Sequence, residues 1–225
     1  MLKSLYQCVL EDITEEPIGP TIWKKIYALE EAELCKIWKH VYVFWKSSKM
    51  IELDYKIMHN CVFTNVKLKK IGLSDSELCV VCHKENEDIM HVFINCDELE
   101  DFHDYLSALL CKIFENCDSD KINLVQSEML LLNGLRWKMK GVNDLFLNFV
   151  LSVARFCIFR RRNLLKNGHK NVHLTKLFQY TLKHYVTYFY VYLCKQNNKS
   201  NVFEKNFLKD NPIVQETDDV LVFDL

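Results

Sequence analysis

The most restrictive feature of the sequence is the pattern C-x2-C-x8-H-x4-C, formed by Cys79, Cys82, His91 and Cys96. Three thiolates and one imidazole are a ligand set that Zn²⁺ prefers in closed, tetrahedral structural sites. The first pair has a spacing that lets a tight turn present both sulfur atoms to one ion. A helix that ends near Asn95 would bring the second pair to the same ion. We therefore predict one structural Zn²⁺ ion per chain, held by these four side chains.

Two alternatives compete with this assignment. His83 directly follows Cys82 and offers a second imidazole beside the cysteine pair. The four residues are also of types that occur singly in protein interiors without any metal. The short spacer between the two pairs favours a shared ion, and we expect His91 rather than His83 to be the ligand.

Composition predicts helices. The chain has 225 residues, enough for one large domain or two small ones, and contains only five glycines and three prolines. A sheet protein of this length needs more turn residues, so long helices joined by short polar loops are favoured. The formal net charge is −1, which does not mark the whole chain as a nucleic-acid binder.

The ten cysteines do not predict disulfides here. The first residues, MLKSLYQCVLEDITEEP, lack the apolar core of a signal peptide, and no apolar run is long enough to cross a membrane. We expect an intracellular protein, nuclear or cytoplasmic and not secreted, with reduced cysteines and no membrane partner. The seven cysteines outside the metal pattern are interpreted as small buried apolar side chains.

Apolar residues recur at helical spacing along most of the chain. The expected fold class is all-α, a helical domain built around a small CCHC zinc-knuckle-like module. The run HYVTYFYVYL also has strand propensity, but its length and periodicity favour a helix. Helices are expected near residues 22–45, 51–62, 99–114, 122–132, 143–166 and 172–195. The predicted regions are N-terminal helices (1–50), the zinc-binding module with flanking helices (51–115), a C-terminal helical region (116–197) and an irregular acidic tail (198–225).

The zinc pattern has a wider sequence context. The segment from Ile51 to Asn163 resembles the zinc-binding region that follows the polymerase in non-LTR (LINE-type) retrotransposon reverse transcriptases. In that family a K-hydrophobic-hydrophobic-H phrase, a threonine and a leucine precede the cysteine pair, and a glutamate and a phenylalanine accompany the later ligands. The matching positions outside the ligands are Lys56, Ile57, Met58, His59, Thr64, Leu68, Glu87 and Phe93. The phrase FLNFVLSVARFCIFRRRN resembles the family's C-terminal helix more weakly.

The chain departs from that family where catalysis is concerned. A reverse transcriptase needs metal-binding aspartates, including an aromatic-x-D-D turn. Asp218 and Asp219 are adjacent, but no aromatic residue stands two positions before them, and they follow the zinc pattern. There is no nuclease signature either. We expect a non-enzyme with no small-molecule substrate, resembling the C-terminal part of such an element on its own.

The resemblance implies binding of RNA or single-stranded DNA. On the helix expected at 143–166, Arg155, Arg162 and Lys166 fall on one stripe, which we call the basic stripe, whereas Arg160 points to the apolar side. Lys67, Lys69 and Lys70 are further candidates for phosphate contacts. Two structural explanations stay open: the lysines form a solvated face, and the helix dipole favours cations in the last turn.

A protein-interaction module that has lost nucleic-acid binding is the alternative. The neutral overall charge, the acidic stretch after the zinc pattern and the acidic C-terminus would then be partner surfaces. A continuous positive groove favours nucleic acid, and a patchwork of charge favours a protein partner.

Overall fold

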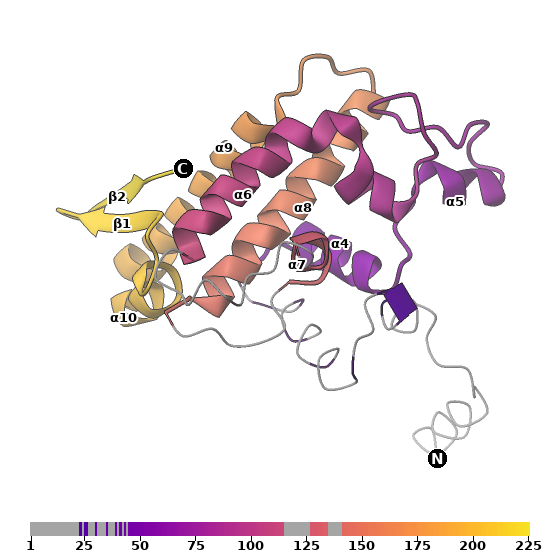
Figure 1. The fold of residues 1–225 in the computed structure, drawn as a ribbon. Helices are drawn as coiled ribbons and strands as arrows, with labels where there is room; N and C mark the ends of the chain where they lie inside the picture. Colours follow the sequence, from indigo (N-terminus) through magenta and orange to yellow (C-terminus); the bar gives the residue numbers. More distant parts are fainter. Residues whose placement is uncertain are drawn as a thin grey trace.

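A computed structural model of the chain describes residues 45–114, 127–134 and 141–225, and isolated residues between 23 and 43. Figure 1 shows helix α8 (Asp144–Lys166) within a helical bundle, with α9 (Leu174–Tyr190) packed against it and α6 (Glu100–Phe114) in contact with α9. The other helices are α4 (Ser48–Met58), α5 (Asn65–Lys70), α7 (Ser127–Asn133) and α10 (Ser200–Phe203). Short π-helical turns cover His91–Asn95, Val191–Gln196 and Glu204–Leu208, and a 3₁₀ turn covers Asp97–Leu99. The strands are β1 (Val214–Thr217) and β2 (Val220–Phe223).

Helix α8 is the element around which the others pack. The Asn143 side chain caps its start by accepting a hydrogen bond of 3.1 Å from the Phe146 amide. It ends in a Schellman motif, with Gly168 at a φ of +85° and the His169 amide bonded to the Leu164 carbonyl. Helices α4, α7 and α9 and the turn at His91–Asn95 all contact it. The helix expected at 143–166 is confirmed.

Aromatic side chains fill the core on both sides of α8. Phe207, from the turn after α10, stacks on Phe203 and meets Phe146, Phe149 and Phe189 edge-on or in parallel. On the other side, the Phe102 ring of α6 makes a T-shaped contact with the Phe178 ring of α9. All the rings of the first cluster are less than a tenth exposed, so burial of aromatic surface is a large part of what holds α10 against the bundle.

The all-α prediction is wrong at the C-terminus. β1 and β2 form an antiparallel hairpin with Val214 opposite Phe223, and Asp218 and Asp219 occupy its two-residue turn at φ values of +52° and +61°. Two consecutive positive φ values are the signature of the turn that suits a tight hairpin. The tail is therefore not irregular. It docks because Ile213 and Val214 are fully buried against the bundle.

Other expected elements differ mainly at their ends. α4 begins at Ser48, before the start of the helix expected at 51–62, because the Ser47 side chain caps it through the Met50 amide. The helix expected at 122–132 is described only from Ser127 onward, where it is helical. The expected helices in 1–50 lie largely outside the described residues, and the division into regions stays a prediction. Over the described part of the chain, no helix is long and apolar enough to cross a membrane.

Candidate metal centre

The first ligand pair is shaped by backbone hydrogen bonds inside a tight turn. The Cys79 amide donates to the Glu85 carbonyl at 2.7 Å, and the His83 amide donates back to the Cys79 carbonyl at 3.0 Å. The Val81 amide points at the Cys79 sulfur, 3.3 Å away. An amide directed at sulfur stabilises a thiolate. His83 sits exposed at a φ of +58°, on the outside of the turn.

The second ligand pair flanks a helical turn. The Asp88 carboxylate accepts a hydrogen bond of 2.7 Å from the His91 amide, which caps the helical residues 89 and 90 that lead into the turn at His91–Asn95. The backbone then becomes extended at Cys96, with φ −73° and ψ 122°. This change of direction turns the Cys96 side chain back towards His91, as the sequence spacing predicts.

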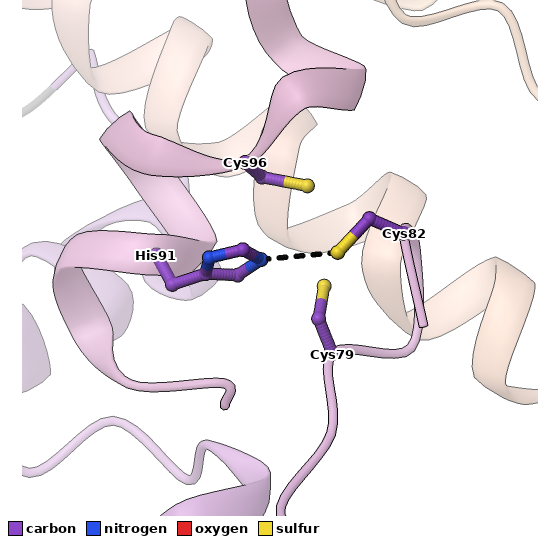
Figure 2. A group of neighbouring side chains, drawn as sticks. All are labelled: Cys79, Cys82, His91 and Cys96. Atoms are coloured by element: carbon purple, nitrogen blue, oxygen red, sulfur yellow. Dashed lines mark hydrogen bonds between the residues drawn. The ribbon is translucent and has the colours of Figure 1, made fainter. Parts of the chain in front are cut away.

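The four side chains converge, as Figure 2 shows. Their ligand atoms all lie within 4.8 Å of one another, and the Cys82 sulfur is 3.3 Å from His91 Nε2. A tetrahedral zinc site with Zn–S bonds of about 2.3 Å places its ligand atoms about 3.8 Å apart. Cys79, His91 and Cys96 are buried and Cys82 is half-buried. We call these four residues the metal cluster, and their geometry fits Zn²⁺.

Proton sharing within the cluster favours metal binding. A hydrogen bond from the Cys96 thiol lowers the pKa of Cys79 to about 5, and the same bond raises the pKa of Cys96. Buried thiols held this close share protons because two neighbouring thiolates repel each other. A divalent cation removes that repulsion and displaces the remaining protons.

His91 is oriented so that Nε2 faces the sulfur atoms. Its Nδ1 is buried and has no hydrogen-bond partner, although Glu85 Oε2 lies 3.3 Å away at an angle that gives attraction without a hydrogen bond. A carboxylate near the outer ring nitrogen favours the tautomer that leaves Nε2 free for a metal. The structure therefore brings His91, and not His83, to the cluster.

The turn that carries Cys79 and Cys82 rests on a buried ion pair with α8. Glu87, which is fully buried, accepts hydrogen bonds from the amides of Val80 (3.1 Å) and Asn65 (2.8 Å). Its carboxylate also meets Arg162 Nη2 at 2.5 Å. Arg162 Nη2 donates further to the Asn65 side chain at 3.1 Å. A single carboxylate thus joins the cysteine turn, α5 and α8.

A second buried network links α4 to α8. Asp54 accepts from Arg155 Nε at 2.7 Å, Lys46 Nζ at 2.8 Å and the Ser152 hydroxyl at 2.7 Å. Burial alone would raise the pKa of Asp54, but Arg155 and Lys46 outweigh that effect and lower it to about 2. Arg155 also donates to the Leu131 carbonyl at 2.6 Å, which brings α7 into the same network.

The prediction that the basic stripe faces solvent is therefore wrong for Arg155 and Arg162. Arg155 and Arg162 are 5% and 4% exposed, and each faces a buried carboxylate instead of solvent. Lys166, at the helix end, is exposed and reaches the Asn65 side chain at 3.3 Å. Arg160, expected on the apolar side, is exposed. The stripe shares one face as predicted, but that face is internal because Asp54 and Glu87 supply the matching charges.

The lysines of α5 are only partly available for phosphate. Lys67 donates to the Asn60 carbonyl, and Lys69 lies 3.7 Å from a Glu77 carboxylate oxygen. Lys70 is exposed, and no salt bridge to it is found among the described residues. Outside the metal cluster, Cys157 is buried as expected, whereas the exposure of Cys35, Cys61 and Cys111 contradicts their assignment to the interior.

Comparison with known families agrees with the zinc pattern. Residues 1–102 match a family model described as zinc-binding in reverse transcriptase. The matched part contains the whole metal cluster and Glu87, so the resemblance to the zinc-binding region of these enzymes is confirmed. No curated protein and no solved structure matches the chain.

Proposed function

We propose that this chain is a non-catalytic, zinc-stabilised accessory module related to the region after the polymerase in LINE-type reverse transcriptases, and that it binds RNA or single-stranded DNA. The observation that carries the proposal is the metal cluster, formed within the part that matches the reverse transcriptase zinc-binding family. When bound, one Zn²⁺ would have three thiolates and an imidazole as ligands. No position would then be left for a catalytic water, which is typical of a structural site.

The absence of catalysis is part of the proposal. Asp218 and Asp219 form the turn of the β1–β2 hairpin, and the Asp219 carboxylate pairs with Lys195 at 3.1 Å. A two-metal polymerase site needs carboxylates that converge on the ions from different elements. Adjacent aspartates at an exposed turn with a lysine partner have the geometry of a hairpin end instead.

Nucleic-acid binding is supported by the family match and by exposed cations that remain after the buried pairs are set aside, among them Arg160 and Lys70. Ultraviolet crosslinking in cells, followed by sequencing of the RNA and DNA recovered with the protein, tests it. We expect RNA or single-stranded DNA to be enriched over a mock purification from cells that lack the protein. No enrichment of either would contradict the proposal.

A zinc-stabilised protein-interaction module remains the second candidate. The acidic side chains Glu98, Asp101 and Asp104 lie in the first turns of α6 or just before it, and all three are exposed. Affinity purification from the same crosslinked cells distinguishes the two. A stoichiometric protein partner with no enriched nucleic acid would favour the interaction module. We expect either form to be intracellular. The eight cysteines among the described residues are all free thiols, which is consistent with a reducing compartment.

A further inference from the structure

A groove of about 900 Å³ lies between α4, α8 and α9, away from the metal cluster. Its walls come from three helices, of which two are joined by a buried hydrogen-bond network and the third is held by packing. Asp54 on α4 is bonded to Arg155 and Ser152 on α8, and α9 packs directly on α8. The groove is therefore a property of the rigid bundle, and binding there would need little rearrangement.

The charge of the groove is positive. Its lining contains three basic side chains, Lys49, Lys56 and Arg160, and one acidic side chain, Glu52. Glu52 is already paired with Lys56 at 2.5 Å. Lys49 and Arg160 are exposed, and neither has a salt bridge within the described part of the chain. Two cations from different helices are thus available to a polyanion.

Exposed aromatic side chains also line the groove. Tyr180 is 69% exposed, and its ring lies nearly parallel to that of His184, with an interplanar angle of 11° and centroids 6.1 Å apart. Both side chains line the groove. Beyond the groove, Tyr188 of α9 and Tyr192 in the π-helical turn that follows form a second exposed pair, with rings parallel to within 7°. Residues four apart on a helix are neighbours on its surface, which accounts for each of the two pairs.

We propose that this groove, with Lys49 and Arg160 as phosphate contacts and Tyr180 and His184 as stacking platforms, is the binding site for single-stranded nucleic acid. Flat, solvent-exposed rings beside unpaired cations match unpaired bases on a phosphate backbone. A duplex fits less well because its bases are already stacked on one another. The assignment rests on the proposed nucleic-acid function and replaces the basic stripe as its location.

The test is fluorescence anisotropy of the zinc-loaded full chain with labelled oligouridine and oligothymidine of about 12 nucleotides, and with a duplex of the same length. The Lys49→Glu, Arg160→Glu variant should bind single strands at least about 25-fold more weakly at about 0.1 M salt, because two lost contacts change the slope of log K against log salt by about 1.4. Lys199→Glu, Lys209→Glu is the matched control. It carries the same change in formal charge at exposed positions outside the groove.

Substitutions of Tyr180 test the contribution of stacking separately from that of charge. Tyr180→Phe keeps the ring and should bind like the unmodified chain, whereas Tyr180→Ala should weaken binding by about 5- to 150-fold with an unchanged salt slope. Because the side chain is exposed, neither change should prevent folding, which circular dichroism checks.

The outcomes distinguish a failure of the groove assignment from a failure of the proposed nucleic-acid function. If the chain binds single strands and the groove variants bind no worse than the control, the groove assignment is wrong and the proposed function stands. If the chain binds neither RNA nor single-stranded DNA, both fail. Equal or tighter binding of the duplex would also overturn the assignment, because stacking on unpaired bases would then have no part in recognition.

Discussion

Replacing Arg162 with methionine removes a charge on which the cysteine turn depends. Methionine keeps much of the length and volume of arginine, so the main loss is the guanidinium that faces Glu87 at 2.5 Å. Glu87 is 0% exposed, and its remaining partners are neutral backbone amides. Leaving a buried carboxylate without its cation costs about 3–5 kcal/mol.

That cost converts into a measurable melting shift. An unfolding entropy of about 2.1 cal/mol/K per residue gives about 0.5 kcal/mol/K for 225 residues, so each kcal/mol moves the midpoint by about 2 °C. Arg162→Met should therefore lower the midpoint by about 6–11 °C at saturating zinc. Arg160→Met is the matched control, since Arg160 is exposed, and it should change the midpoint by about 1 °C or less.

A second change in the Arg162→Met chain tests the reasoning. Adding Glu87→Leu removes the unpaired charge, but the amides of Asn65 and Val80 then lose their acceptor. Stability should return only in part, because unsatisfied buried amides carry their own cost. Differential scanning calorimetry measures all four chains. Equal midpoints for Arg162→Met and Arg160→Met would refute the argument that the inward-facing arginine supports the turn.

Three further outcomes are expected. Metal analysis should find one Zn²⁺ per chain, and Cys96→Ser should lose most of it whereas Cys61→Ser, at an exposed cysteine, should keep it. The pKa of Asp54 is lowered from 3.8 to about 2 in the folded chain, so its ionisation contributes about 2 kcal/mol of stability above pH 4. This contribution is lost as the pH falls from 4 towards 2. Urea titrations of Asp54→Asn should therefore show a flatter dependence of stability on pH in this range. Primer extension with Mg²⁺ or Mn²⁺ should be blank, and activity that disappears on changing Asp218 and Asp219 would overturn the non-catalytic proposal.

The metal cluster was predictable because its information is local. The spacing of Cys79 and Cys82 specifies a turn, and the spacing of His91 and Cys96 specifies one turn of helix followed by an exit. All four ligands stand between residues 79 and 96, so their approach to within 4.8 Å follows from spacing within one short segment. The periodicity of α8 was predictable for the same reason, since its cap, its apolar repeat and its Gly168 stop all lie within the helix or next to it.

The direction of the α8 arginines was not predictable from the helix itself. α8 is buried around most of its circumference, so apolar periodicity does not single out one solvent side. The carboxylates that draw Arg155 and Arg162 inward stand on other elements, and sequence spacing does not reveal such pairs. Glu87 could be singled out only as a family position, because Glu85 and Asp88 also lie between the two ligand pairs and spacing does not distinguish the three acids.

The C-terminal hairpin was missed for a different reason. Its two strands have only four residues each, and their turn uses Asp218-Asp219 instead of the stronger asparagine-glycine or aspartate-glycine signals. The short apolar run VLVF, rich in strand-forming residues and directly after a two-residue acidic turn, was the available clue.

The partnership of Glu87 with Arg162 also bears on how the chain can be divided. The part that matches the zinc-binding family ends at residue 102 and includes every ligand, but the cation that neutralises Glu87 belongs to a helix that begins at Asp144. A fragment cut at residue 102 would possess all the metal chemistry and lack the counter-charge beneath it. During synthesis, likewise, the cysteine turn leaves the ribosome well before Arg162 does. The four ligands are therefore complete before Arg162 is available, and a metal bound at that stage would hold a turn whose buried carboxylate still lacks its cation.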